Sequence, residues 1–211
     1  SRIIFGTQVA LAVGVSTVIV SATVGTIFGL VAGYAQGFVQ TIIMRVTDAL
    51  MAIPALILTL ILAAILKKGV VGVVLAVSVM LIPGYIRLIC GQVLSVKQND
   101  YVMAERSMGA MKIRIMLRHI LPNCLSPLIV QMTMMIGVAI LAEASLSFLG
   151  LGIMPPTPAW GGLCNDGQKY LMMRPLLSLA PGLAIMILVF AFNMVGDGLR
   201  DALDPKLRGT N

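Results

Sequence analysis

The chain has 211 residues, of which 59% are hydrophobic and only 11% charged, and its net charge is +7. Soluble domains carry about 25% charged residues, so this composition excludes a soluble protein and indicates an integral membrane protein. In such proteins an excess of Lys and Arg gathers in cytoplasmic loops, so the positive charge is no sign of nucleic-acid binding. A single His and three Cys residues without metal-type spacing argue against a metal site and leave few candidates for catalytic residues.

Apolar segments recur along the chain, and a helix needs about 20 apolar residues to cross the bilayer. We therefore predict an all-α, polytopic transmembrane helical bundle. Prolines are expected to kink the third span at Pro83 and to bend the second and fourth spans in their first turns, at Pro54 and Pro127. The predicted spans cover residues 9–34, 42–66, 70–88, 125–142 and 177–195.

The distribution of Lys and Arg predicts the orientation of these spans. With the 89–124 loop in the cytoplasm, ten of the 15 Lys and Arg residues lie inside, and Lys67 and Lys68 form a local exception. The 143–176 loop then lies outside and the C-terminal tail inside. Ser1 would lie outside, so we expect a further helix to precede this sequence.

The first span carries small residues at intervals of four. Small side chains at this spacing allow another helix to approach closely. We predict a tight helix–helix seam, either within the subunit or with a partner. The residues that form the series are Ser21, Gly25, Gly29, Gly33 and Gly37.

A polar interruption, Tyr101 to Asn123, separates the third and fourth spans. A short helix is predicted at its start, with Asp100 as N-cap, and Gly109 is expected to join it to a second helix because Gly accepts a positive φ. Pro122 is expected to end the second helix. The apolar face of that helix is formed by Ile113, Met116, Leu117, Ile120 and Leu121, spaced i, i+3, i+4, i+7 and i+8.

The residues alone leave three interpretations of this loop. It could lie on the inner leaflet as a basic amphipathic helix. It could be an ordinary solvated connection. It could also dock onto a partner protein, since helix-in-groove binding uses the same spacing of apolar residues.

The loop resembles the EAA loop of ABC importer permeases. Gly109 matches the central Gly of that motif, and Ile120, Leu121 and Pro122 match its closing residues. Met103, Ala104 and Glu105 stand where the family usually has Glu-Ala-Ala, so the acidic residue comes two positions later. Further blocks at 85–95, 143–161 and 191–205 resemble the second, or "C", permease of the dipeptide/oligopeptide/nickel transport family.

This resemblance implies the type I fold of ABC importer permeases and a multi-pass subunit of a prokaryotic inner or plasma membrane. The subunit would be a permease and not an enzyme, with no cofactor of its own. The implied partners are a second homologous permease, two ATPase subunits that bind ATP and Mg, and an extracytoplasmic binding protein, all within or beside membrane lipid. Full-length members have an additional N-terminal helix and an extracytoplasmic segment.

The implied cargo is di- or oligopeptides, and the alternatives are nickel, metal chelates or glutathione. The resemblance also implies which residues of the loop enter a groove on the ATPase subunit: Ala104, Glu105, Arg106, Ser107, Met108, Gly109, Ala110 and Met111.

A few polar residues near the ends of spans have more than one interpretation. Arg45 and Asp48 predict an intrahelical ion pair or a contact of Asp48 with a neighbouring helix, near the cytoplasmic boundary, and Asp48 is also a candidate pathway residue. Glu143 would line the outer vestibule or hold the segment that follows it. Trp160 is predicted to be a membrane-interface anchor.

A second class of function is an ion-coupled secondary transporter or channel. Such a protein needs acidic residues within the membrane or an inverted repeat. Only Asp48 and Glu143 qualify, both near predicted span ends, and no repeat is evident. The importer interpretation is therefore preferred, and a membrane-embedded enzyme has too few candidate residues.

Overall fold

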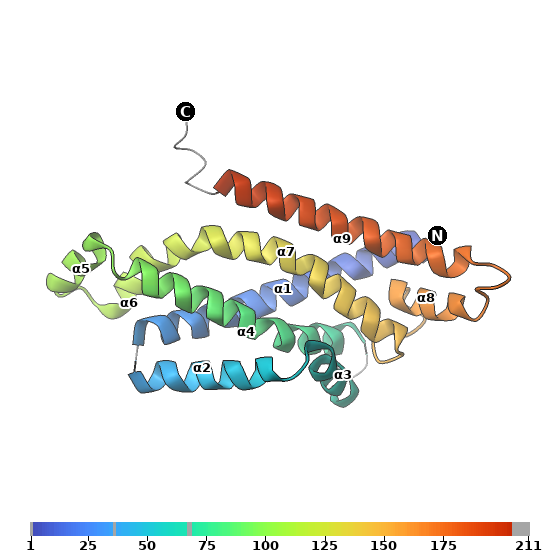
Figure 1. Cartoon of the computed structure of the whole chain (residues 1–211), viewed down its shortest axis with the longest axis horizontal. Helices are drawn as coiled ribbons and strands as arrows, with labels where there is room; N and C mark the ends of the chain where they lie inside the picture. Colours follow the sequence, from blue (N-terminus) through green and yellow to red (C-terminus); the bar gives the residue numbers. More distant parts are fainter. Residues whose placement is uncertain (1, 36, 67–68, 204–211) are drawn as a thin grey trace.

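The computed structural model describes residues 2–35, 37–66 and 69–203. Long helices lie side by side in an elongated bundle, and short helices extend it at both ends (Figure 1). Every regular element within the described ranges is helical. The elements are α1 (Arg2–Ala35), α2 (Gly37–Ala52), α3 (Ala55–Ile65), α4 (Val70–Val96), α5 (Asp100–Ser107), α6 (Lys112–Ile115), the π-helical turn η1 (Met116–Ile120), α7 (Leu121–Phe148), α8 (Trp160–Gln168) and α9 (Leu176–Leu203).

Four continuous helices of the described chain are long and apolar enough to cross a membrane: α1, α4, the run Lys112–Phe148 and α9. The predicted second span, 42–66, is not one helix, because α2 and α3 are bent by 93°. The break lies at Pro54, which lacks an N–H and also disfavours helical backbone at the residue before it. The sequence predicted a bend at this proline, and the structure interrupts the helix there.

The predicted loop 89–124 is shorter in the structure than in the sequence analysis. Helix α4 continues to Val96 and passes through Pro83 without interruption, and the next long helical run begins at Lys112. The outer loop is shorter as well, because α7 continues to Phe148. We call the segment between α4 and α6, residues 97–111, the projecting loop.

The glycine series of α1 packs against α4. A Cβ atom on Gly29 would lie 2.7 Å from the Cβ atom of Ile89 and 2.9 Å from the backbone oxygen of Ile86. A Cβ atom on Gly33 would lie 2.6 Å from the Cβ atom of Val93. Since these separations are shorter than real side chains tolerate, the two helices approach as closely as they do only because these positions are glycine. The seam therefore lies within the subunit.

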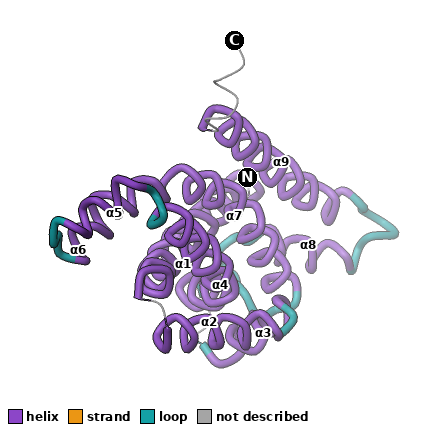
Figure 2. Tube along the Cα trace, turned by 60° about the vertical axis from the view of Figure 1, so that its left-hand side comes forward, coloured by secondary structure: helices purple, strands orange, loops and turns teal. Residues whose placement is uncertain are grey.

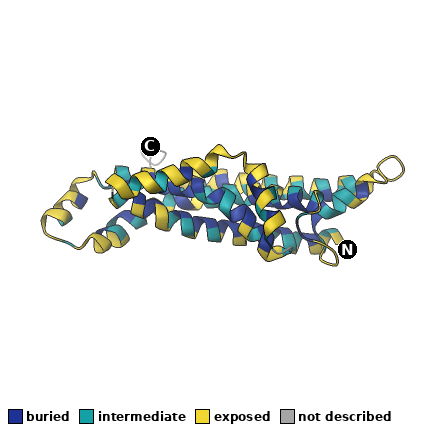
Figure 3. Cartoon of the chain, turned by 90° about the horizontal axis from the view of Figure 1, so that it is seen from below, coloured by how far each residue is buried: buried dark blue, intermediate teal, exposed yellow. Residues whose placement is uncertain are grey.

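The buried residues lie along the inside of the bundle, and exposed residues lie on the outer faces of the helices and on the loops at both ends (Figure 3). Helix α9 lies at the edge of the bundle, against α7 and α8 (Figure 2). Its outward side chains Ile187 and Phe190 are 64% and 63% exposed. In a membrane protein such positions face lipid or another subunit.

Gly29→Ala is expected to destabilise the bundle by about 1–3 kcal/mol, because the added methyl group overpacks the α1–α4 seam. Gly91→Ala on α4 is the matched control, since a Cβ atom there meets nothing within 4 Å. That control should be neutral or gain up to about 1 kcal/mol from helix propensity. Thermal unfolding of the purified complex in detergent measures both, and equal effects would contradict the close approach.

Candidate functional site

The projecting loop extends beyond the end of the long helices, where α5 and α6 are seen in Figure 1. Helix α5 ends at Ser107, and Gly109 follows with φ of 81°, the left-handed conformation predicted for it. The N-cap of α5 is Asn99, one residue earlier than the predicted Asp100. The predicted order of helix, Gly turn and helix is therefore present. We call the end of the bundle that carries this loop the loop end.

Apolar side chains are exposed around the Gly109 turn. Met108 is 75% exposed, Met111 71% and Ile113 66%. The basic residues Arg106 and Lys112 are exposed beside them. The remaining residues of the predicted contact segment are also exposed or half-buried, with Ala104, Ser107 and Gly109 exposed and Glu105 and Ala110 half-buried.

The base of the projecting loop is held against the start of α7. Val102 is buried in the core, and the Glu105 Oε1 atom lies 3.5 Å from the His119 Nε2 atom. The rings of Tyr101 and His119 are 6.3 Å apart between centroids. Asn123 Nδ2 lies 3.2 Å from Tyr101 Oη, to which it donates, and 2.6 Å from the backbone oxygen of His119. This contact was not predicted, because the sequence analysis considered the single His as a possible metal ligand.

A lysine at the start of the loop joins α4 to α1. Lys97 Nζ donates a hydrogen bond of 3.0 Å to the backbone oxygen of Gly33. Partial desolvation lowers the pKa of Lys97, and the nearby charge of Arg106 lowers it further. The loop end of the glycine seam is thus tied to the base of the projecting loop.

Pro122 does not end the second helix, contrary to the prediction. The chain forms a π-helical turn over Met116–Ile120, in which the N–H of Leu121 bonds to the oxygen of Met116, and α7 continues from there. The wider turn admits the proline, which has no N–H to donate.

This turn also divides the predicted apolar face. Ile120 is buried, Met116 and Leu121 are half-buried, but Ile113 and Leu117 are exposed. Ile115, which was not predicted, is buried in their place. The prediction assumed a regular α-helical period, and a π-turn shifts that period.

Asp48 pairs with a residue of another helix. Arg87 Nη2 on α4 lies 2.8 Å from Asp48 Oδ1 on α2, and the two side chains are 51% and 49% exposed. Of the two structural interpretations of Asp48, the contact with a neighbouring helix is present, whereas the ion pair within α2 is replaced. Sequence analysis did not identify Arg87, which is 39 residues away in the chain.

Glu143 is only 1% exposed and lies inside the bundle. Ser147 Oγ donates a 2.7 Å hydrogen bond to Glu143 Oε1 and accepts a 3.0 Å hydrogen bond from the Ile153 N–H. The carboxyl group therefore holds the segment that follows α7. Of the two interpretations of Glu143, this geometry supports the one in which it fixes that segment, and the side chain does not face an open surface.

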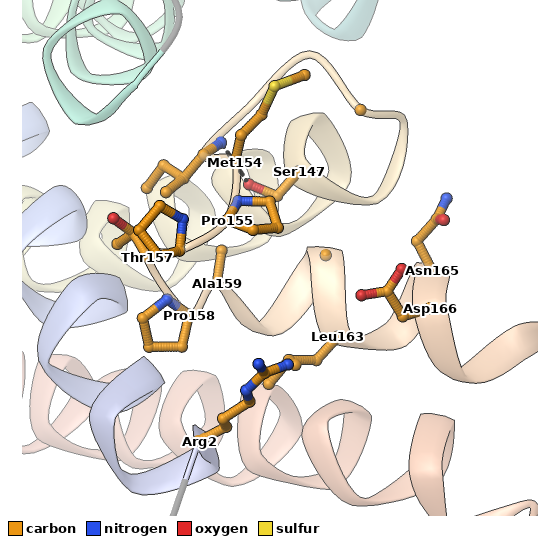
Figure 4. Close-up of a pocket in the computed structure, with 14 residues that line it drawn as sticks. Arg2, Ser147, Met154, Pro155, Thr157, Pro158, Ala159, Leu163, Asn165 and Asp166 are labelled. Atoms are coloured by element: carbon orange, nitrogen blue, oxygen red, sulfur yellow. Dashed lines mark hydrogen bonds between the residues drawn. The ribbon is translucent and has the colours of Figure 1, made fainter.

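A cavity of about 220 Å³ lies between this segment and α8. Asp166 of α8 and Arg2 of α1 both point toward it, and Pro155 and Pro158 line it from the segment that follows α7 (Figure 4). Trp160, the first residue of α8, is 3% exposed, and its Nε1 donates a 2.9 Å hydrogen bond to the backbone oxygen of Ile3. Trp160 is thus a buried link between α8 and α1, and the prediction of a membrane-interface anchor is wrong.

Two solved structures with a similar fold are of the MetNI methionine ABC transporter. The MetNI methionine ABC transporter in inward-facing conformations matches with a TM-score of 0.70 at 19% identity in its CY5 native crystal form, covering 92% of this chain and 94% of that one. The SeMet soak form of the same transporter matches with a TM-score of 0.68 at 18% identity, covering 96% of each chain. At such identity the likeness shows the fold alone.

Curated relatives are much closer in sequence. The glutathione transport system permease protein GsiD of Escherichia coli O6:K15:H31 (strain 536 / UPEC) is 46% identical over 209 residues, which cover 99% of this chain and 69% of that protein. The GsiD protein of Shigella boydii serotype 4 (strain Sb227) matches to the same extent. The family described as binding-protein-dependent transport system inner membrane component matches residues 25–209. The chain therefore belongs to this family: it is a multi-pass inner-membrane permease subunit of an ABC importer.

Proposed function

We propose that the chain forms half of the translocation pathway of an ATP-driven importer for di- or oligopeptides, glutathione among them. The relatives named as glutathione permeases support a peptide cargo, and nickel or metal chelates are the alternative. The proposed partners are a second homologous permease, two ATPase subunits that bind ATP and Mg, and an extracytoplasmic binding protein. ATP hydrolysis is assigned to the ATPase subunits, and this chain is proposed to hold no cofactor.

The observation that carries the coupling part of this proposal is the exposed apolar tip of the projecting loop. The loop continues the long axis of the bundle (Figure 1), and that axis is the direction in which the helices cross the membrane. The tip therefore points away from the bilayer and into water. Met108 and Met111 would be exposed to water there unless a protein covers them, so the geometry favours docking over a helix lying on the leaflet.

The base of the loop can transmit the motion of such a partner. Val102 joins it to the bundle core, and the contact of Glu105 with His119 joins it to the helical run that continues into α7. A shift of the docked tip would thus move α7, which packs on α1, α4 and α9. Alternating access by tilting of packed helices follows from such a shift.

Gly109→Pro is expected to lower ATP-driven uptake and substrate-stimulated ATPase activity at least about tenfold, because proline fixes φ near −65° where the loop needs 81°. Gly109→Asn is the matched control, since Asn tolerates the left-handed conformation and should keep most activity. The assay uses the complete complex in proteoliposomes with its binding protein. Unchanged uptake that needs no ATP would contradict the proposal and favour the secondary transporter.

Ser147→Ala is expected to loosen the segment 149–159, because the Ile153 N–H and the Glu143 carboxyl each lose a buried partner, at roughly 1–3 kcal/mol per group. Hydrogen exchange of the assembled transporter should rise in this segment. Ser145→Ala is the control, since Ser145 Oγ bonds only within its own helix, to the Leu141 oxygen at 2.8 Å. Equal exchange in both variants would show that the hydrogen bonds do not hold the segment.

A further inference from the structure

The Asp48–Arg87 ion pair lies far from the loop end along the long axis of the bundle. Arg87 precedes the end of α4 at Val96 by nine residues, which is about 14 Å along a helix. Asp48 follows the start of α2 at Gly37 by eleven residues, or about 16 Å. Both helix ends lie at the loop end (Figure 1). Half of a bilayer's hydrocarbon core is about 15 Å, so a membrane boundary at these helix ends would put the pair near mid-membrane.

The pair is also accessible from outside the chain. Both side chains are about half exposed, at 51% for Arg87 and 49% for Asp48. Charged groups at this depth are costly in contact with lipid and almost always face water or a protein interior. The face of the subunit that carries them must therefore be turned away from lipid.

The surroundings of the pair leave space in front of it. Gly84 and Gly91 lie one turn before and one turn after Arg87 on α4, both are exposed, and a Cβ atom at either would meet nothing within 4 Å. The absence of side chains at these positions leaves the guanidinium open to a solute. Helix α9, in contrast, presents large exposed apolar residues such as Ile187 and Phe190.

The charge of this face indicates which solutes it accepts. Arg45 is exposed one turn from Asp48 on α2, so the described face holds two cations and one anion. A free metal cation would meet net repulsion there. A peptide carries a carboxylate and an ammonium group, which can exchange partners with Arg87 and Asp48 without loss of an ion pair.

We propose that Asp48, Arg87 and Arg45 line the aqueous translocation pathway at mid-membrane and select zwitterionic or anionic peptides over cations. Arg87 binds the carboxylate of the passing peptide, and Asp48 binds its ammonium group. This inference rests on the proposed function, because it assumes a pathway between two permeases. It adds the residues of that pathway that contact the cargo. It also favours peptides, glutathione included, over free nickel.

The test measures the reaction of a cysteine placed beside the pair. Gly84→Cys is made in the assembled transporter with Cys164→Ser, because Cys164 is the native cysteine that is not fully buried, whereas Cys90 and Cys124 are. The rates with an anionic and a cationic water-soluble methanethiosulfonate are compared in membrane vesicles. We expect both reagents to react, the anionic one faster. Arg87→Gln should lower the ratio of the two rates by about tenfold or more, the effect of one charge at close range in a partly shielded site.

Arg87→Lys is the conservative variant and should keep the preference for the anionic reagent. Met194→Cys on α9 is the position control, because Met194 is 60% exposed on an apolar helix and lies nine residues before the helix end at Leu203. Its rate should be at least about tenfold lower, since only the hydrated thiolate reacts.

Two results would overturn the proposal. In the first, neither water-soluble reagent modifies Gly84→Cys while a lipid-soluble maleimide does, which would place this face against lipid. In the second, the rate ratio is the same with Arg87 and with Gln, which would show that the pair does not select charge. The labelling needs no transport, so its outcome is independent of whether ATP-driven peptide uptake, the test of the proposed function, succeeds.

Discussion

The close approach of α1 and α4 is the constraint on which the remaining structure depends. At Gly29 and Gly33 the backbone of α1 lies so near the side chains of α4 that no Cβ atom fits between them. In a membrane, helices associate through packing of this kind because lipid offers no hydrophobic driving force. The seam reaches the loop end, where Lys97 Nζ at the base of the projecting loop bonds to the Gly33 oxygen. It also places Arg87 of α4 within reach of α2, which begins two residues after the end of α1.

Local patterns were enough to predict much of the fold. Apolar length identified the long helices, the spacing of small residues identified the seam, and Gly109 marked a turn with positive φ. The predictions were wrong or incomplete where the structure around a residue changes the effect that a local pattern has by itself. Pro122 was expected to stop a helix, but a π-turn absorbs it. Pro54 was expected to bend a helix, and it separates two helices at 93°.

The candidate sites were harder to predict from the sequence, because the residues that contact each other in them are distant in the chain. Asp48 was a candidate, but its partner is 39 residues away, and nothing in the intervening sequence connects them. Glu143 was ambiguous between an open vestibule and a structural role. The difference depends on whether Ser147 and Ile153 fold back onto it, and burial of that kind follows from tertiary packing. The same holds for His119, whose contacts with Tyr101 and Glu105 span the projecting loop.

The π-turn over Met116–Ile120 has a consequence for how this subunit can vary. A π-turn accommodates one residue more than the α-helical turn it replaces, so it sets the rotational phase between the projecting loop and α7. Each residue of an α-helix turns the chain by about 100°. Deleting one residue here would therefore rotate the tip of the projecting loop by about that angle around the axis of α7. Point substitutions can thus tune the tip gradually. A change of length in this one turn would instead redirect the loop as a whole, and the proposed ATPase partner would have to shift with it.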